Sequence, residues 1–175
     1  MIHVMAVDLS LTHSGIAVTG AHGGPVCLSW VPKFKGTPRL EEIRRCTEET
    51  ITQYQPDVAI MEGSVFRSQQ AYGMGQGGGV FRLCLRDNGI PLVEAPPATL
   101  KFFVLGKGIG DKNEIIAAAI RTLGFDGHDD NEADALVLWH LAQYTLGQST
   151  LGHTVPRDRA VKKLELDAWG EVMSR

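Results

Sequence analysis

Cysteine is scarce in this sequence. The three cysteines, Cys27, Cys46 and Cys84, are widely separated and do not form the close pairs of a zinc site. An odd, scattered set also argues against a disulfide framework, so the composition favours a reducing compartment. We therefore expect a cytoplasmic protein.

Long apolar runs are absent as well. A membrane-spanning helix needs about 20 consecutive apolar residues, and no stretch of the sequence approaches that length. The opening residues MIHVMAVDLS contain no basic leader, so a secretory signal is not expected either. The sequence predicts a protein with no membrane partner.

An excess of positive charge is also missing. The chain carries 17 Lys and Arg residues against 20 Asp and Glu residues, which gives a net charge of −3. General basicity therefore gives no sign of nucleic-acid binding. Any such contact must rest on a local group of basic residues.

The chain does have the length and apolar content of one folded domain. With 175 residues, of which 43% are hydrophobic, it can bury a substantial core but is too short for two domains of ordinary size. We predict one domain over residues 1–147 and a C-terminal tail over 148–175, with a short helix near 157–169.

The order of the predicted elements indicates an α/β fold. Short runs of β-forming residues between Gly and Pro breaks predict strands at 2–9, 12–20, 25–31, 56–63 and 90–97. Apolar residues at helical spacing predict helices at 37–54, 69–89, 98–106, 111–124 and 129–147. Three consecutive strands followed by crossovers predict a mixed five-stranded sheet flanked by helices.

Acidic residues crowd the start of the last long helix. The segment DDNEAD (129–134) contains four acids, whereas capping a helix and matching its dipole needs only one or two. Asp130 and Asp134 share one face of the helix, next to the apolar positions that bury it. A carboxylate at such a border is costly to bury unless a cation compensates it, and a divalent metal is a common solution.

Two further acids end predicted strands. Asp8 ends the first and Glu62 the fourth, and each by itself could simply begin a turn. Ligands of α/β sheets gather at the carboxyl ends of neighbouring strands, so Asp8, Glu62 and Asp134 would meet if these strands are adjacent. Three such carboxylates suit Mg²⁺ or Mn²⁺, and two ions can cleave a phosphodiester bond. His128 and His140 are candidate proton carriers, although a lone His is more often structural.

Five stretches carry a family resemblance: VDLSLTHSGIAV, PDVAIMEGSVF, GIPLVEAPPATLK, GKGIGDKNEI and DDNEADALVLWHLA. In their order and spacing, over residues 2–147, the chain resembles RuvC-like Holliday-junction resolvases. The resemblance implies a ribonuclease H-like fold, a homodimer, two divalent ions per site and paired symmetric nicks in a four-way DNA junction. It implies that Asp8, Glu62 and Asp134 are the catalytic, metal-binding acids. The short, tail-bearing form resembles viral or phage members more than cellular ones.

The fourth metal ligand is open between two residues. The family commonly has Asp or His three residues before its last Asp, where this sequence has Asn131, and Asp130 lies one residue earlier. Asn131 could bind through its neutral carbonyl oxygen. We favour Asp130 as the fourth catalytic acid, because its charge compensates a metal better and its i,i+4 relation to Asp134 keeps both on one helix face.

Candidate DNA contacts lie in two segments. Lys101, Lys107 and Lys112 surround a glycine-rich segment; they could be ordinary solvated lysines, but the resemblance implies that they border the active cleft and contact phosphates. Arg67 would extend this basic rim. Phe66 could pack in the core or, beside the chemistry of a junction enzyme, stack on an unpaired base.

Other functions also fit parts of the sequence. The segment GMGQGGG (73–79) contains a G-x-G-x-x-G pattern, but no clear strand precedes it and no partner acid follows, so we favour a close-contact surface, as in a dimer interface, over a nucleotide cofactor. An actin-like or sugar-kinase-like ATPase shares the first loop but needs two domains. A non-catalytic junction-binding protein would have no need of three mutually repelling acids.

Overall fold

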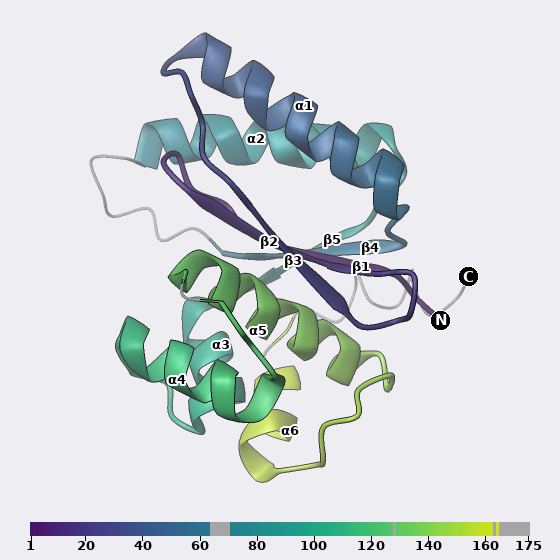
Figure 1. Ribbon diagram of the computed structural model, residues 1–175, viewed down its shortest axis with the longest axis vertical. Helices are drawn as coiled ribbons and strands as arrows, with labels where there is room; N and C mark the ends of the chain where they lie inside the picture. The colour runs from purple at the N-terminus through teal and green to yellow at the C-terminus, as the bar shows by residue number, and fades with distance from the viewer. Residues whose placement is uncertain (64–70, 128, 163, 165–175) are drawn as a thin grey trace.

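The structure is a computed structural model that describes residues 1–63, 71–127, 129–162 and 164. It contains a five-stranded sheet with helices packed on both faces (Figure 1). The strands are β1 (Val4–Asp8), β2 (Ser14–Thr19), β3 (Pro25–Trp30), β4 (Val58–Glu62) and β5 (Leu92–Ala95). The predicted α/β class and the five predicted strands are confirmed.

The sheet has the order β3-β2-β1-β4-β5 and mixes both strand directions. Strand β1 is antiparallel to β2, with Asp8 opposite Gly15, and parallel to β4, with Val7 opposite Met61. Because β1 and β4 run side by side in the same direction, Asp8 and Glu62 end adjacent strands at one edge of the sheet. The adjacency on which the predicted acid cluster depended is therefore present.

Two layers of helices enclose the sheet (Figure 1). One face is covered by α1 (Thr37–Tyr54) and α2 (Ala71–Asp87). The other is covered by α3 (Pro97–Leu105), α4 (Lys112–Leu123), α5 (Asp130–Thr145) and α6 (Val155–Val161). No helix within the described residues combines the length and the apolar composition that a membrane span requires.

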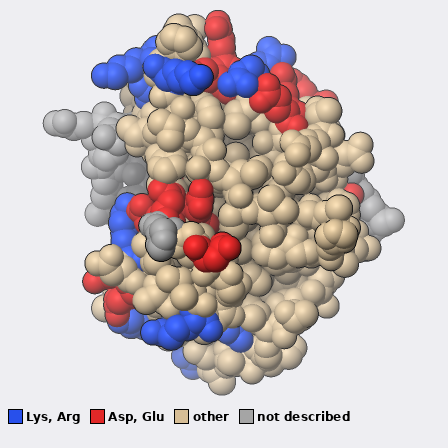
Figure 2. Space-filling view, in the orientation of Figure 1, with Lys and Arg blue, Asp and Glu red and all other residues tan. Residues whose placement is uncertain are grey.

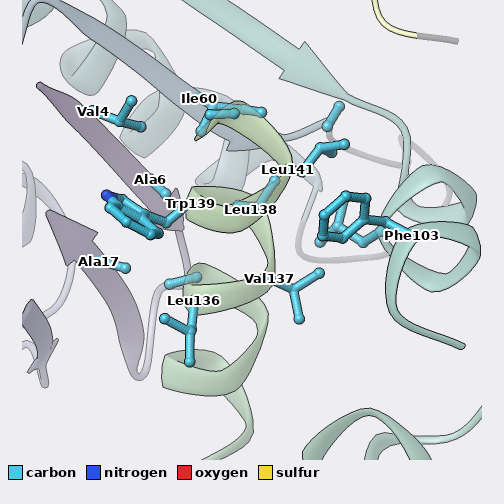
Figure 3. Close-up of a cluster of buried hydrophobic side chains, with 14 of the residues drawn as sticks. Val4, Ala6, Ala17, Ile60, Phe103, Leu136, Val137, Leu138, Trp139 and Leu141 are labelled. Carbon is cyan, nitrogen blue, oxygen red and sulfur yellow. The ribbon is translucent and has the colours of Figure 1, made fainter. Parts of the chain in front are cut away.

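Helix α5 is the central helix of the larger core. It contacts β1, β2, β3 and β4 on one side and α3, α4 and α6 on the other. Its side chains Leu136, Leu138, Trp139 and Leu141 are almost completely buried between these layers (Figure 3). The apolar residues therefore surround much of the helix instead of forming one stripe, as expected for a helix covered on both sides.

A second core lies between the sheet and the first helical layer. Met5, Val7, Met61 and Phe81 fill it and are almost fully buried. Helices α1 and α2 pack against each other above this core, and a Cβ on Gly77 would lie 2.9 Å from the Cδ1 atom of Ile43. The absence of a side chain at this position lets α2 approach α1 closely.

The segment after α5 folds back onto the domain. Ala160 in α6 is completely buried, and the Tyr144 hydroxyl donates to an Asp158 carboxylate oxygen at 2.6 Å. The sequence predicted a short helix near 157–169, and the structure describes a helix over 155–161, α6. The domain boundary at residue 147 stays a prediction, and residues 163 and 165–175 lie outside the described part of the chain.

A buried hydroxyl joins α5 to the two strands beneath it. The Thr19 Oγ1 atom accepts from the backbone N–H of Val4 at 2.9 Å and from the Trp139 indole N–H at 3.1 Å. The Gln143 amide donates to the same oxygen at 3.4 Å. Because buried polar groups are costly unless they are paired, this network favours one position of α5 along the sheet.

The start of α5 touches the backbone of β2. A Cβ built on Gly15 would lie 1.9 Å from the carbonyl oxygen of Asn131 and 2.6 Å from the backbone nitrogen of Glu132. These distances are far inside normal contact, so any side chain at Gly15 would push the helix start away. Glycine at this position sets how closely the acidic end of α5 approaches the sheet.

We predict that Gly15→Ala destabilises the protein by about 1–3 kcal/mol or more, as overpacking does when backbone must move. Urea unfolding measures the free-energy change. Gly24→Ala is the matched control, because its Cβ would meet nothing within 4 Å. Equal stability of Gly15→Ala and the parent chain would show that α5 does not need this close approach.

Candidate active site

Three predicted acids meet at the carboxyl edge of the sheet. Asp8 ends β1, Glu62 ends β4, and Asp134 lies near the start of α5, which packs across these strands. All three residues are half-buried. Acidic side chains gather over the start of α5, with basic ones beside them (Figure 2). Chain segments from residues 8, 62 and 134 thus build one acidic site.

The loop after Asp8 is closed by its own hydroxyl groups. The Ser14 hydroxyl donates to the Ser10 carbonyl at 3.0 Å, and the Ser10 N–H donates back to the Ser14 oxygen at 3.0 Å. Ser14 is buried at the start of β2. These reciprocal hydrogen bonds hold the turn that directly follows Asp8. They therefore restrict the position of the Asp8 backbone at the end of β1.

Burial and mutual repulsion make these acids reluctant to ionise. Removal from water, followed by repulsion from the Glu62, Asp134 and Asp130 carboxylates, raises the pKa of Asp8 to about 8. Burial, followed by repulsion from Glu62 and Asp130, raises the pKa of Asp134 to about 7. Burial likewise raises the pKa of Glu62. The folded chain thus holds carboxylates whose charge it compensates only in part.

Two lysines supply part of that compensation. Lys112 forms an ion pair with Asp130, which lowers the pKa of Asp130, and its charge also opposes the upward shifts at Asp8 and Asp134. The Lys101 charge lowers the pKa of Glu62, although burial still raises it overall. The lysines therefore lie close enough to act on the acids electrostatically.

The two candidates for the fourth ligand have different surroundings. Asp130 is the first residue of α5 and pairs with Lys112, whereas the Asn131 side-chain amide lies 3.4 Å from the Asp129 carboxylate. Asp129 is the N-cap, because its carboxylate accepts from the Glu132 N–H at 3.0 Å. One acid of the DDNEAD segment thus caps the helix, as the simpler interpretation expected.

A histidine that the sequence analysis did not identify joins this end of the site. The Nδ1 atom of His13 lies 3.1 Å from Asp129 Oδ2, which ties the loop between β1 and β2 to the start of α5. The only signal in the sequence was its position five residues after Asp8.

Of the two histidines proposed as proton carriers, the structure describes His140, and its recorded contact is with α4. His140 is turned toward the end of α4, where it has a hydrogen bond with the backbone of Leu123, and burial lowers its pKa to about 4. It is therefore a neutral, structural residue at ordinary pH. His128 lies outside the described residues.

The predicted basic residues that the structure describes already have partners within the protein. Lys107 Nζ lies 2.5 Å from a Glu114 carboxylate oxygen, and Lys101 Nζ donates to the Gly110 carbonyl at 3.0 Å. Lys112 pairs with Asp130, as described above. Phe66 and Arg67 lie outside the described residues, so their predicted DNA contacts stay predictions.

The donor chemistry of the site fits a hard divalent cation. Carboxylate oxygens are the preferred ligands of Mg²⁺. A cation would compensate the charge of the buried carboxylates and the mutual repulsion, the two effects that raise the pKa values of Asp8 and Asp134. Within the described residues, no three His, Cys, Asp or Glu side chains already surround one point as a finished metal cage. Binding would therefore need the carboxylates to turn toward a common ion.

We predict that Asp8→Asn stabilises the metal-free protein at high pH. The folded-state pKa of Asp8, about 8, lies above the ordinary value of 3.8. An acid with a raised folded pKa costs stability as pH rises between the two values, because the unfolded chain loses its proton first. Relative to Asp8→Asn, the parent chain should lose stability from about pH 4 to about pH 8.

Unfolding with EDTA across this pH range measures the difference. Asp126→Asn, at an exposed position, is the control and should follow the parent chain. A difference between Asp8→Asn and the parent that stays constant with pH would contradict unfavourable ionisation at Asp8.

Comparison with known sequences identifies the family. The family model for "Crossover junction endodeoxyribonuclease RuvC" matches residues 4–139. A RuvC from Prochlorococcus marinus (strain MIT 9303) is 32% identical over 144 residues, which cover 77% of this chain and 94% of the relative. A RuvC from Streptomyces avermitilis is 30% identical over 168 residues, covering 86% and 95%. The match to a Synechococcus RuvC (strain CC9311), at 36% identity, covers only 64% of that relative.

Solved structures share the fold. The Thermus thermophilus RuvC structure has a TM-score of 0.67 at 22% identity and covers 84% of this chain and 98% of its own. A fowlpox virus resolvase, solved with Holliday junction DNA, is more distant, with a TM-score of 0.53 and 15% identity. The expected resemblance to viral members is therefore found only at the level of the fold. The family match and these relatives together show that the chain belongs to the RuvC family of crossover junction endodeoxyribonucleases.

Proposed function

We propose that this chain nicks four-way DNA junctions at two symmetric positions, and that Asp8, Glu62 and Asp134 hold the metal ions that this hydrolysis needs. The observation that carries the proposal is the group of three half-buried carboxylates, in which burial and then mutual repulsion raise the pKa values of Asp8 and Asp134. Keeping such a group is costly for stability, and metal-dependent chemistry gives a reason for it.

Mg²⁺ is the expected metal, with Mn²⁺ as a substitute and two ions in each site. The family generally uses Mg²⁺. When bound, such ions supply a water of lowered pKa and stabilise the oxygen that leaves the phosphate. The donors we propose are Asp8 and Glu62, which end adjacent strands, and Asp134 from the helix that packs across them.

Asp130 is our candidate for the fourth acid. Its ion pair with Lys112 keeps it ionised, since that contact lowers its pKa. The same lysine would have to release Asp130, or share it, when a metal binds. Asn131 is the alternative and would contribute only a neutral oxygen.

The basic residues beside the acids would hold the DNA backbone. Lys101, Lys107 and Lys112 lie on or around the loop between α3 and α4, and Lys101 and Lys112 act electrostatically on the acids. Phosphates would compete with Glu114 and Asp130 for these lysines. Arg67 and Phe66 complete the proposed DNA contacts, Phe66 by stacking on an unpaired base.

We predict that Asp8→Asn, Glu62→Gln and Asp134→Asn each abolish junction cleavage but leave junction binding intact, because the metals serve the chemistry more than the affinity. Nicking of labelled four-way junctions with Mg²⁺ or Mn²⁺ measures the first effect, and a binding titration in EDTA the second. Asp126→Asn is the control. Wild-type nicking by one of the three variants would remove that residue from the site.

The same assay ranks the fourth ligand. Asp130→Asn should impair cleavage more than Asn131→Ala, and the reverse order would identify Asn131 as the ligand. Paired nicks in the absence of ATP would also separate this function from an ATPase, and binding without nicking would indicate a junction-binding protein.

We propose further that the chain forms a homodimer through α2. Tyr72 and Leu83 are 79% and 56% exposed, and Gly75 and Gly79 between them are exposed. A Cβ at either glycine would meet nothing within 4 Å. This stripe of apolar and small residues along one helix would let two copies approach closely.

Gly79→Glu should therefore shift the chain toward monomer without unfolding it, because the new side chain enters open space and places charge on the stripe. Sedimentation velocity measures the assembly state. Gln53→Glu, on the exposed side of α1, is the control. A Gly79→Glu dimer as stable as that of the parent would place the interface elsewhere.

A further inference from the structure

Ile109 is an apolar side chain presented to solvent in the loop that joins two of the helices carrying the basic residues. It is 78% exposed and lies in the loop between α3 and α4. Single exposed apolar residues are common and need no explanation by themselves. Three observations set Ile109 apart. The loop backbone is packed tightly, Ile109 lies only a few residues from lysines, and two of those lysines act on the acids.

The backbone around Ile109 is packed tightly against its neighbours. Gly106 ends α3 in the left-handed region, at φ +74°, and donates its N–H to the Phe102 carbonyl at 3.1 Å. A Cβ on Gly108 would lie 2.7 Å from the Phe102 ring, and one on Gly110 would lie 2.4 Å from Leu105. The glycines on both sides of Ile109 thus face inward onto α3, while the isoleucine side chain faces solvent.

Both ends of the loop are also fixed by polar contacts. The Gly110 carbonyl accepts from Lys101 Nζ at 3.0 Å. Asp111 then caps α4 in a reciprocal arrangement with Glu114, which also pairs with Lys107. Because these contacts already fix the loop, the binding of a ligand at Ile109 would cost little further backbone entropy.

The loop is joined to the acids through its lysines. Lys101, which holds Gly110, acts electrostatically on Glu62, and Lys112, three residues after Ile109, pairs with Asp130. Along the chain, Ile109 therefore lies between Lys101 and Lys112, the two lysines whose charges act on the acids, and next to Gly110, which Lys101 contacts. A DNA strand bound by these lysines would come near the loop that carries Ile109.

An isoleucine side chain cannot form a hydrogen bond or an ion pair with a phosphate, but it can pack against a base whose face is not stacked. Proteins that distort DNA insert Ile, Leu, Met or Phe between base steps in this way. Intact duplex hides the base faces by stacking, whereas the branch of a junction exposes them. We propose that Ile109 inserts at the branch point and helps this chain select branched over linear DNA.

This inference rests on the proposed junction cleavage, so its test separates the two. Ile109→Ser removes the apolar contact and Ile109→Leu keeps it. Ile120→Ser, at a 49% exposed position on α4, controls for losing an exposed isoleucine, and Lys107→Ala represents a phosphate contact. Binding to a four-way junction and to a linear duplex of the same base composition is titrated in EDTA at several salt concentrations.

We expect Ile109→Ser to weaken junction binding about tenfold, because the mutation removes an apolar side chain that would become buried when the DNA binds. Duplex binding and the salt slope should not change. Lys107→Ala should instead weaken both DNAs and reduce the salt slope by about one unit. Ile109→Leu should retain most of the junction affinity. In a junction that carries 2-aminopurine at the branch, the fluorescence of this base should change when the parent chain binds but not when Ile109→Ser binds.

Equal junction affinity of Ile109→Ser and the parent chain would overturn the inference, as would an equal loss on junction and duplex. A change of assembly state in Ile109→Ser would assign the residue to a protein contact and would also overturn it. If the parent chain itself neither binds junctions more tightly than duplex nor nicks them, the proposed function is wrong. This outcome differs from the failure of the Ile109 inference alone, in which the parent chain still nicks junctions.

Discussion

The contact between the start of α5 and the backbone of β2 is the constraint on which the site depends. Gly15 leaves no room for a side chain under Asn131, so the helix rests directly on the sheet. The Thr19 hydroxyl fixes the same helix further along through Trp139. With both contacts made, Asp134 is held over the strand ends that carry the other acids, and a small displacement of the helix would separate it from them.

This arrangement has an electrostatic cost. Asp8, Glu62 and Asp134 are half-buried, and burial is the largest cause of the raised pKa at each. Lys101 and Lys112 oppose these shifts but do not remove them. A folded chain that keeps such a group is less stable than one with neutral residues there, which is the pattern expected where function and stability conflict. In a RuvC-family chain, metal-dependent cleavage is the function that accounts for the conflict.

Much of the site could be predicted because its acids stand at recognisable places. Asp8 and Glu62 each end an apolar run, and Asp134 lies one turn into a helix, so only the adjacency of β1 and β4 had to be assumed. The parallel register of these strands confirms it. His140 shows the limit of such reasoning: a histidine on the same helix as Asp134 faces α4 instead, where burial lowers its pKa and makes it structural.

The elements, their order and the positions of the three acids at element ends could be predicted from the sequence, because hydrophobic periodicity and breaks at Gly and Pro are local properties. The partners of the charged side chains became known from the fold: Lys112 with Asp130, His13 with Asp129, and Lys101 with the Gly110 carbonyl. The first two of these contacts join residues far apart in the chain. The sequence offers several possible partners for each charged side chain, and the choice among them depends on distances that exist only once α4 and α5 have packed against the sheet and each other.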